Sequence, residues 1–250
     1  LSELLHNEDN QNRLQIPFET CVKIVSSVAK AIAYIHDMNI IHRDMKAENL
    51  LVDENFNVCV ADLGISCLRA RRQSKGMGTP KYMAPELLEG KSYTEKVDVF
   101  SFGILCWEIL TKQIVYEQEE FTSWEISEKV VGGYRPKLPA EWPPVIASIV
   151  MACWNQEPSK RPTMNHVCSV LKPLEGKSYE EMKCIQPKQK ALSKFLVHSS
   201  SVVSSPSQVF KQAAQAAKSK KKELKKKDKE KRGRQPSFKK LGHSLLSPQR

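Results

Sequence analysis

Residues 41–49 read Ile-His-Arg-Asp-Met-Lys-Ala-Glu-Asn, and this stretch decides the fold when it is taken together with two others further along the chain. Residues 62–64 read Asp-Leu-Gly, and residues 84–86 read Ala-Pro-Glu. Each of the three is uninformative by itself, because Asp-Met-Lys and Asp-Leu-Gly also occur in ordinary helices and turns. Their order and spacing within one chain are far more specific, so the three motifs are interpreted as a set.

Further stretches fit the same order. Tyr82-Met83 precedes the Ala-Pro-Glu, residues 98–103 read Asp-Val-Phe-Ser-Phe-Gly, and Cys153-Trp154 is followed by Arg161-Pro162. The set resembles the catalytic loop, the metal-binding motif and the P+1 boundary of the eukaryotic protein kinase family, from residue 1 to about residue 172. Within that family the chain is most similar to serine/threonine kinases of the tyrosine-kinase-like group.

The hydrophobic pattern predicts a mainly helical chain. Apolar residues recur at steps of three and four over Phe18–Asp37, which is typical of a helix with one buried face. Thr94–Leu110 is apolar nearly all round, so Asp98 and Ser101 within it are expected to be buried. The pattern predicts further helices over Ser2–His6, Phe121–Val131, Pro144–Trp154 and Thr163–Leu171.

One β-hairpin is predicted beside the catalytic loop. Asn49–Val52 and Val58–Ala61 are short apolar runs that flank a polar turn, and their pairing would bring Asn49 and Asp62 to the same rim. Gly64–Pro80 shows no period and is interpreted as a surface loop. The predicted fold class is therefore mainly α, an α+β kinase-like C-terminal lobe with a small β-hairpin at the catalytic rim.

The resemblance implies a role for each polar residue of the motifs. Asp44 would be the catalytic base that orients the substrate hydroxyl, and Lys46 would reach the γ-phosphate of ATP. Asn49 and Asp62 would be oxygen ligands of Mg²⁺, so that Lys46, Asn49 and Asp62 together bind the Mg²⁺–ATP substrate. His42 would be structural and buried beneath the metal motif.

Three other residues are implied to support the catalytic loop or to regulate it. Glu86 would form a buried ion pair with Arg161, and Asp98 would accept N–H groups from the loop. Arg43 would bind a phosphate on the activation loop, because an arginine gains charge-assisted hydrogen bonds from a phosphorylated side chain. The available acceptors are Ser66, Ser74 and Thr79, of which Ser74 is preferred, although it is equally well read as an ordinary exposed serine.

The predicted function is therefore a protein serine/threonine kinase that uses ATP and Mg²⁺ to modify protein substrates. The alternative is a catalytically silent kinase-like scaffold, against which stand the intact Asp44, Lys46, Asn49 and Asp62. No Gly-x-Gly-x-x-Gly loop and no Val-Ala-x-Lys strand precede His42 in this sequence. The expectation is that the N-lobe is absent and that the chain alone is inactive.

Charge divides the chain into two parts. Of the 250 residues, 1–175 hold 19 Lys+Arg against 23 Asp+Glu, whereas 176–250 hold 20 against 5. Residues 1–175 are predicted to form the incomplete kinase domain and 176–250 a disordered Lys-rich tail, which is too poor in apolar residues to build a core. The tail is either a solvated charge run or a binding segment for an anionic partner, whether importin, lipid or RNA.

The sequence also gives an expectation for the cellular location of the protein. No apolar run approaches the length of a transmembrane helix, and no signal peptide pattern opens the chain. The seven cysteines are scattered without metal-ligand spacing, so they are predicted to be reduced and mostly core thiols. The expected location is the cytoplasm or the nucleus.

Overall fold

The computed structural model describes residues 1–6, 16–62, 67–68 and 78–187. They belong to one of the two units into which the chain divides, residues 1–198, and residues 199–250 lie outside the described part. The predicted disordered tail therefore remains a prediction. The α-helices of the described residues are α1 (Ser2–His6), α2 (Phe18–Asp37), α3 (Pro85–Leu88), α4 (Lys96–Thr111), α5 (Ser123–Val131), α6 (Pro144–Cys153), α7 (Met164–Leu171) and α8 (Tyr179–Lys183). The mainly helical prediction is confirmed.

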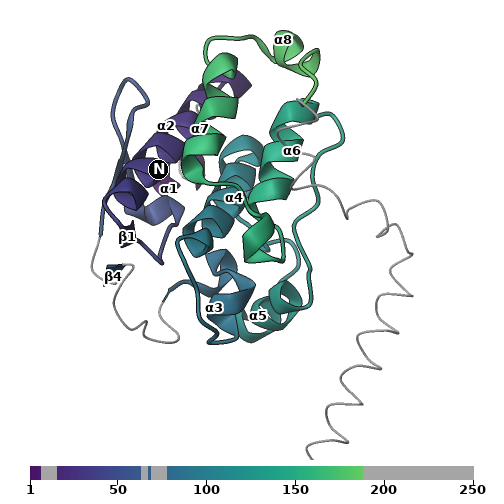
Figure 1. Ribbon diagram of the computed structural model, residues 1–250. Coiled ribbons are helices and arrows are strands. Elements are labelled where there is room, and N and C mark those ends of the chain that lie inside the picture. The colour runs from purple at the N-terminus through teal and green to yellow at the C-terminus, as the bar shows by residue number, and fades with distance from the viewer. Residues whose placement is uncertain (7–15, 63–66, 69–77, 188–250) are drawn as a thin grey trace, which may run out of the picture. The chain divides into compact units, whose positions relative to one another are not determined.

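Helix α4 is the centre of the core. Every residue from Val97 to Leu110 is buried, as expected for a helix that is apolar nearly all round. It packs between α2 on one side and α6 on the other, and α7 covers α2 (Figure 1). The predicted burial of Asp98 and Ser101 is confirmed, since their exposed fractions are 0% and 5%. These two polar groups are therefore available only to partners inside the lobe.

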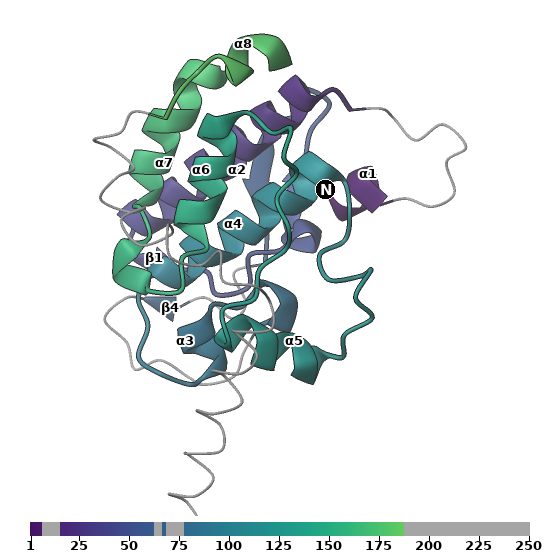
Figure 2. The ribbon, with the colours of Figure 1, turned by 90° about the vertical axis from the view of Figure 1, so that its right-hand side faces the viewer.

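Helix α1 contacts the 3₁₀ helix that ends at Asn49, and three other helices lie at two opposite ends (Figure 1). Helices α3 and α5 contact each other at one end, and α8 lies at the other (Figures 1 and 2). Helix α5 begins with a capping box. The Thr122 side chain accepts from the Glu125 N–H, and the Glu125 carboxylate accepts from the Thr122 N–H. Short 3₁₀ helices complete the connections, over Ala47–Asn49, Pro80–Tyr82, Pro158–Lys160 and Lys172–Leu174.

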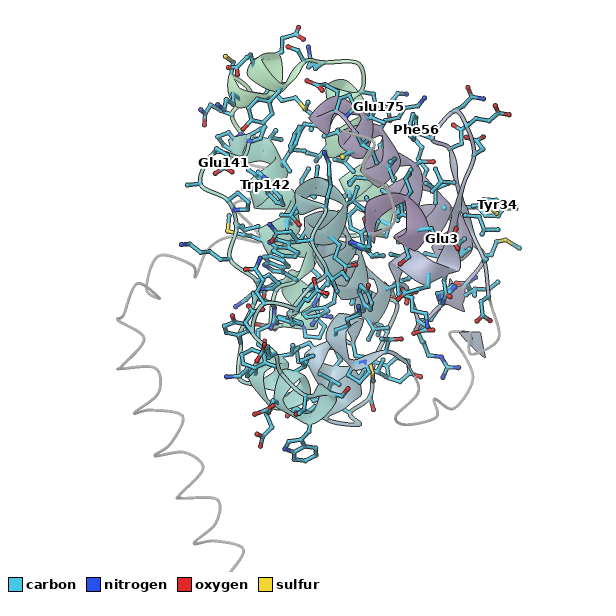
Figure 3. All side chains as sticks on the ribbon, turned by 180° about the vertical axis from the view of Figure 1, so that it is seen from behind. Glu3, Tyr34, Phe56, Glu141, Trp142 and Glu175 are labelled. Carbon is cyan, nitrogen blue, oxygen red and sulfur yellow. The ribbon has the colours of Figure 1, made fainter. Side chains whose placement is uncertain are left out.

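The predicted β-hairpin is confirmed. Strand β2 (Leu50–Val52) pairs antiparallel with β3 (Val58–Val60), and the register places Leu50 opposite Val60. Asp53 holds the turn, because its carboxylate accepts from the backbone N–H groups of Asn55 and Asn57. The hairpin packs on α2, and Figure 3 places Phe56 of the turn near the same end of α2 as Glu175, which accepts from Ser26 of that helix. The catalytic rim is thus fixed to the core.

A second strand pair corrects the loop that was predicted over Gly64–Pro80. Strand β1 (Ile40–Ile41) pairs with β4 (Cys67–Leu68), so part of this segment joins the strand that leads into the catalytic loop. Two-residue strands are too short to show a period of two, which is why the sequence pattern missed them. Residues 63–66 and 69–77 lie outside the described part.

The thiol prediction is confirmed only in part. Cys21, Cys106 and Cys153 are free and buried in the core, where burial raises the pKa of each thiol. Cys59 and Cys184 are free but exposed. Cys59 is exposed because it alternates with inward residues on β3, so that its side chain lies on the outer face of the hairpin.

Candidate active site

The catalytic loop between β1 and β2 is anchored by the buried Asp98 of α4. One carboxylate oxygen of Asp98 accepts from the His42 N–H at 2.8 Å, and the other accepts from the Arg43 N–H at 2.8 Å. Arg43 has φ of 72°, a left-handed conformation that is strained for a residue with a side chain. The two hydrogen bonds to Asp98 hold the loop in this conformation, so the predicted supporting role of Asp98 is consistent with the geometry.

His36 completes the anchor and was not identified from the sequence. Its Nε2 lies 2.9 Å from the same Asp98 oxygen that receives the His42 N–H. The side chains of both partners are almost fully buried, at 8% and 0% exposed. A lone histidine near the end of a helix gives no sequence signal of such a contact, since its partner lies 62 residues away.

Asp44 lies at the centre of a cluster of donors. Lys46 Nζ is 2.9 Å from Asp44 Oδ2, and Thr79 donates to Oδ1 through both its N–H, at 3.1 Å, and its hydroxyl, at 3.0 Å. The Asn49 amide donates to the backbone carbonyl of Asp44 at 2.9 Å and to Oδ2 at 3.2 Å. The Asp44 side chain is 14% exposed, so it can still meet a substrate.

These donors keep Asp44 ionised. Desolvation is the largest single influence and raises the pKa of Asp44, but the hydrogen bonds from Lys46, Thr79 and Asn49 and the charge of Lys46 outweigh it. The net pKa lies below the ordinary value of 3.8. The arrangement therefore provides a fixed, ionised carboxylate that can accept a hydrogen bond.

The predicted metal ligands come to one rim, as the hairpin prediction required. The Ala61 N–H donates to the Asn49 carbonyl at 2.8 Å, so Asp62 leaves β3 directly beside Asn49. Asp62 is exposed and has φ of 57°, which turns it out of the strand direction. The Asn49 nitrogen is used by Asp44, which leaves the amide oxygen of Asn49 as the atom that could face a cation.

The oxygen donors of this rim fit Mg²⁺. No group of three or more His, Cys, Asp or Glu that could enclose a metal occurs within residues 1–6, 16–62, 67–68 and 78–187. A cation at the rim could be held by the Asn49 amide oxygen and the Asp62 carboxylate. Mg²⁺ suits such a site, because it commonly takes one or two protein oxygens and completes its shell with phosphate and water.

An apolar patch adjoins the rim on the outer face of the hairpin. Leu51 is 59% exposed, whereas Leu50 before it is fully buried, as the alternation of a strand requires. Leu51 lies opposite Cys59 in the register, and both belong to the face that continues to Asn49 and Ala61. Period-two alternation in the sequence could have identified this outward apolar residue.

His42 lies where the sequence predicted. It is fully buried, and its Nε2 contacts the carbonyl oxygen of Ala61 at 3.1 Å, immediately before Asp62. The Asp44 N–H donates to His42 Nδ1 at 3.3 Å. His42 thus joins the loop of Asp44 to the strand that ends at Asp62.

The predicted pair of Glu86 and Arg161 is present. The guanidinium donates to both carboxylate oxygens, at 2.6 and 2.9 Å, and the exposed side-chain fractions are 7% for Glu86 and 0% for Arg161. Arg161 also donates to backbone carbonyls of Asn155 and Lys96 and lies over the ring of Phe100. The pair therefore connects α3 to the start of α4 and to the segment before α7.

The structure places Arg43 away from bulk solvent. Its guanidinium donates to the hydroxyl of Tyr93 at 3.2 Å, and only 6% of the residue is exposed. Ser66 and Ser74 lie outside the described residues, so the preferred phosphate acceptor stays a prediction. Thr79 donates its hydroxyl to Asp44, which indicates a positioning role rather than that of a phosphate acceptor. The sequence pattern missed this role.

Residues 1–171 match the family model of the protein tyrosine and serine/threonine kinases. This chain belongs to the protein kinase family. The matched region ends within a few residues of the boundary that the motifs predicted, and it contains every residue of the cluster around Asp44.

Individual relatives support the same assignment. The serine/threonine/tyrosine-protein kinase HT1 of Arabidopsis thaliana is 39% identical over 163 residues, which cover 62% of this chain and 40% of that protein. A probable LIM domain-containing serine/threonine-protein kinase of Dictyostelium discoideum is 38% identical over 159 residues, 63% of this chain and 24% of that protein. The probable kinase drkB of the same organism is 37% identical over 186 residues, 73% of this chain and 26% of that protein. This kinase chain thus spans 40% or less of the length of each.

Among the residues that the structure describes, no helix is both long enough and apolar enough to cross a membrane.

Proposed function

We propose that this chain carries the catalytic lobe of a serine/threonine protein kinase, which transfers the γ-phosphate of ATP to hydroxyl groups of protein substrates. The observation that carries the proposal is the Asp44 carboxylate, held by Lys46, Thr79 and Asn49 yet still partly exposed. Phosphoryl transfer depends on positioned charge and on an oriented nucleophile more than on covalent chemistry. A fixed, ionised carboxylate that accepts the hydrogen bond of the attacking hydroxyl meets the second requirement.

Asp44 and the residues around it would have different roles in phosphate transfer. Asp44 would orient the attacking hydroxyl and receive its proton as the new oxygen–phosphorus bond forms and the bond between the γ-phosphorus and the bridging oxygen of ATP breaks, which releases ADP. Lys46 lies 2.9 Å from Asp44 and 3.3 Å from the Thr79 hydroxyl, so its positive charge sits beside the place where the phosphate is transferred. Thr79 would fix the direction of the carboxylate by its two hydrogen bonds.

Asn49 and Asp62 would hold Mg²⁺, as their oxygens at one rim indicate. When bound, Mg²⁺ neutralises the negative charge of the phosphates. The exposed Leu51 beside this rim would give the base of the nucleotide an apolar surface to pack on, because burying exposed apolar area is favourable. The 250-residue sequence contains no Gly-rich phosphate loop. We therefore propose that residues outside it complete the nucleotide site.

The proposed preference for serine and threonine rests on Lys46 and Thr79. The two residues contact each other and Asp44, so the features that suggested this class from the sequence belong to one arrangement in space. The relatives are named as serine/threonine kinases, and HT1 is named as a serine/threonine/tyrosine kinase. Dual specificity is therefore an outcome that the test must distinguish.

The test compares the 250-residue chain with the same chain extended at its N-terminus by a nucleotide-binding lobe, from its own transcript or from HT1. Transfer of radioactive γ-phosphate to a generic protein substrate is measured, followed by phosphoamino acid analysis. We expect phosphoserine and phosphothreonine from the extended chain and no transfer from the 250-residue chain. An extended chain that binds ATP without any transfer would support the silent scaffold. Robust transfer by the 250-residue chain would show that no further lobe is needed.

A further inference from the structure

Helix α4 carries a row of buried polar side chains on one face. Asp98, Ser101 and Glu108 follow each other at steps of three and seven residues, so they lie on the same side of the helix. Their exposed fractions are 0%, 5% and 0%. Asp98 holds the catalytic loop, since it accepts from the N–H groups of His42 and Arg43. Glu108 is a buried acid that the proposed mechanism does not use, and its partners indicate a role.

Both carboxylate oxygens of Glu108 have a hydrogen-bond donor. Oε2 accepts from the Tyr82 hydroxyl at 2.7 Å, and Oε1 accepts from the Val115 N–H at 3.0 Å. Burial raises the pKa of this carboxyl group, and the hydrogen bonds from the two donors oppose the increase. A carboxylate in a core is costly, whereas an apolar side chain would pack there without that cost. The presence of an acid at this position is therefore explained by its two partners.

Tyr82 is held by this row of α4 at both its side chain and its backbone. Its hydroxyl donates to Glu108, and its carbonyl accepts from the Ser101 hydroxyl at 2.8 Å. Tyr82 is the last residue of the 3₁₀ helix Pro80–Tyr82, and its N–H donates to the Thr79 carbonyl at 3.0 Å. Only 3% of Tyr82 is exposed. The position of Thr79 is therefore fixed to α4 through one short turn.

We propose that Glu108 is a positioning residue for phosphate transfer. Through Tyr82 it holds the turn that places Thr79 against Asp44, to which Thr79 donates by both its N–H and its hydroxyl. One face of α4 then supports both segments that meet at Asp44, since Asp98 holds the catalytic loop and Glu108 holds the turn after Thr79. A displacement of about 1 Å at such a contact can reduce a rate by about a hundredfold.

The path from Glu108 to Thr79 is tested on the 250-residue chain by NMR of the Thr79 N–H, whose hydrogen bond to a carboxylate moves its proton signal downfield. Tyr82→Phe removes only the hydroxyl that donates to Glu108. We expect it to move the Thr79 signal upfield, and Glu108→Gln to move it in the same direction. A loss of stability alone does not change the signals of the folded state. Tyr134→Phe, which removes a hydroxyl that donates to Glu119, is the matched control and should leave the signal unchanged.

The effect on the reaction rests on the proposed function and is measured on the chain extended with a nucleotide-binding lobe. We expect Tyr82→Phe and Glu108→Gln each to lower kcat by about tenfold or more while KM for ATP stays unchanged, because the turn and not the nucleotide site is altered. The double variant should lose no more than the weaker single variant, since both changes break one contact. If the extended wild type shows no transfer, the proposed function fails, and the Thr79 signal still decides whether Glu108 positions the turn.

Tyr82→Phe keeps the test decisive if Glu108→Gln fails to fold, because phenylalanine fills the same space as tyrosine without its oxygen. Ser101→Ala is a further variant, since it releases the Tyr82 carbonyl and should move the Thr79 signal as well. A Thr79 signal and a kcat that both stay at their wild-type values in Tyr82→Phe would overturn the proposal. Equal effects of Tyr82→Phe and Tyr134→Phe would overturn it too.

Discussion

At the scale of single residues, Asp98 and Asp44 show how two aspartates in one lobe take different roles. Asp98 is fully buried, and both of its carboxylate oxygens accept hydrogen bonds from backbone N–H groups or His36. It is therefore not accessible to a substrate. Asp44 is partly exposed and receives side-chain donors that a substrate could replace. Burial and partner type, rather than residue type, separate the supporting carboxylate of Asp98 from the one that we propose to be reactive.

The titration of Asp44 tests its environment. We expect an NMR titration of its carboxyl carbon to give a pKa below 3.8, and Lys46→Met to raise it, because a donor and a positive charge are lost. Since the folded pKa lies below the unfolded one, Asp44 contributes stability above pH 3.8 that is lost as the pH falls through the folded pKa. Lys81→Met, which removes a nearby lysine that does not contact Asp44, is the matched control. An unchanged pKa in Lys46→Met would contradict the assigned contacts.

The buried ion pair gives a prediction about stability. Arg161→Ala leaves the Glu86 carboxylate buried without its partner, and we expect it to lower the free energy of unfolding by roughly 3 to 5 kcal/mol. The neighbouring Lys160 pairs with Glu157 in solvent, so Lys160→Ala should cost less than about 1 kcal/mol. Urea unfolding of the two variants measures the difference. Equal unfolding midpoints for both variants would show that the buried pair with Glu86 contributes no more to stability than the exposed pair does.

At the scale of elements, the β2–β3 hairpin sets the distance between the two proposed metal ligands. Asn49 stands before β2 and Asp62 two residues after β3, and they meet because the register pairs Leu50 with Val60. A slip of one residue would turn Leu51 inward and move Asp62 away from Asn49. The register depends in turn on the turn residue Asp53.

The turn can be tested through hydrogen exchange. Asp53→Ala removes the acceptor for the N–H groups of Asn55 and Asn57. We expect faster exchange of the Ala61 N–H, which bonds to Asn49 across the hairpin. Glu54→Ala changes an adjacent exposed acid that makes no such bonds in the described structure, and it should exchange as the wild type does. Identical rates for the two variants would mean that Asp53 does not control the register.

Long, strongly patterned elements were predictable from the sequence, and contacts between distant residues were not. Helix α2 begins and ends at Phe18 and Asp37 as its period predicted, and α4 differs from its predicted bounds by one or two residues. Strands β1 and β4 have two residues each and carry no period. The bond of Thr79 to Asp44 and the contact of His36 with Asp98 depend on separations of 35 and 62 residues, which no local pattern reports.

At the scale of the whole molecule, the charge is divided unevenly between the folded lobe and the tail. Residues 1–175 have four more acids than bases, and 176–250 have fifteen more bases than acids. The lobe has its own core around α4, so its stability should not depend on the tail. A chain of residues 1–187 is therefore expected to melt at the same temperature as the 250-residue chain. A large decrease would show that the tail contributes to the fold.

The central claim is that Asp44 acts as the base in phosphotransfer. The most direct measurement is the initial rate of γ-phosphate transfer by the chain extended with a nucleotide-binding lobe, compared with the same protein carrying Asp44→Asn, with ATP affinity measured on both. We predict a loss of at least about a hundredfold in rate, as for removal of a general base, with ATP affinity preserved. Comparable rates in the two proteins would contradict the claim.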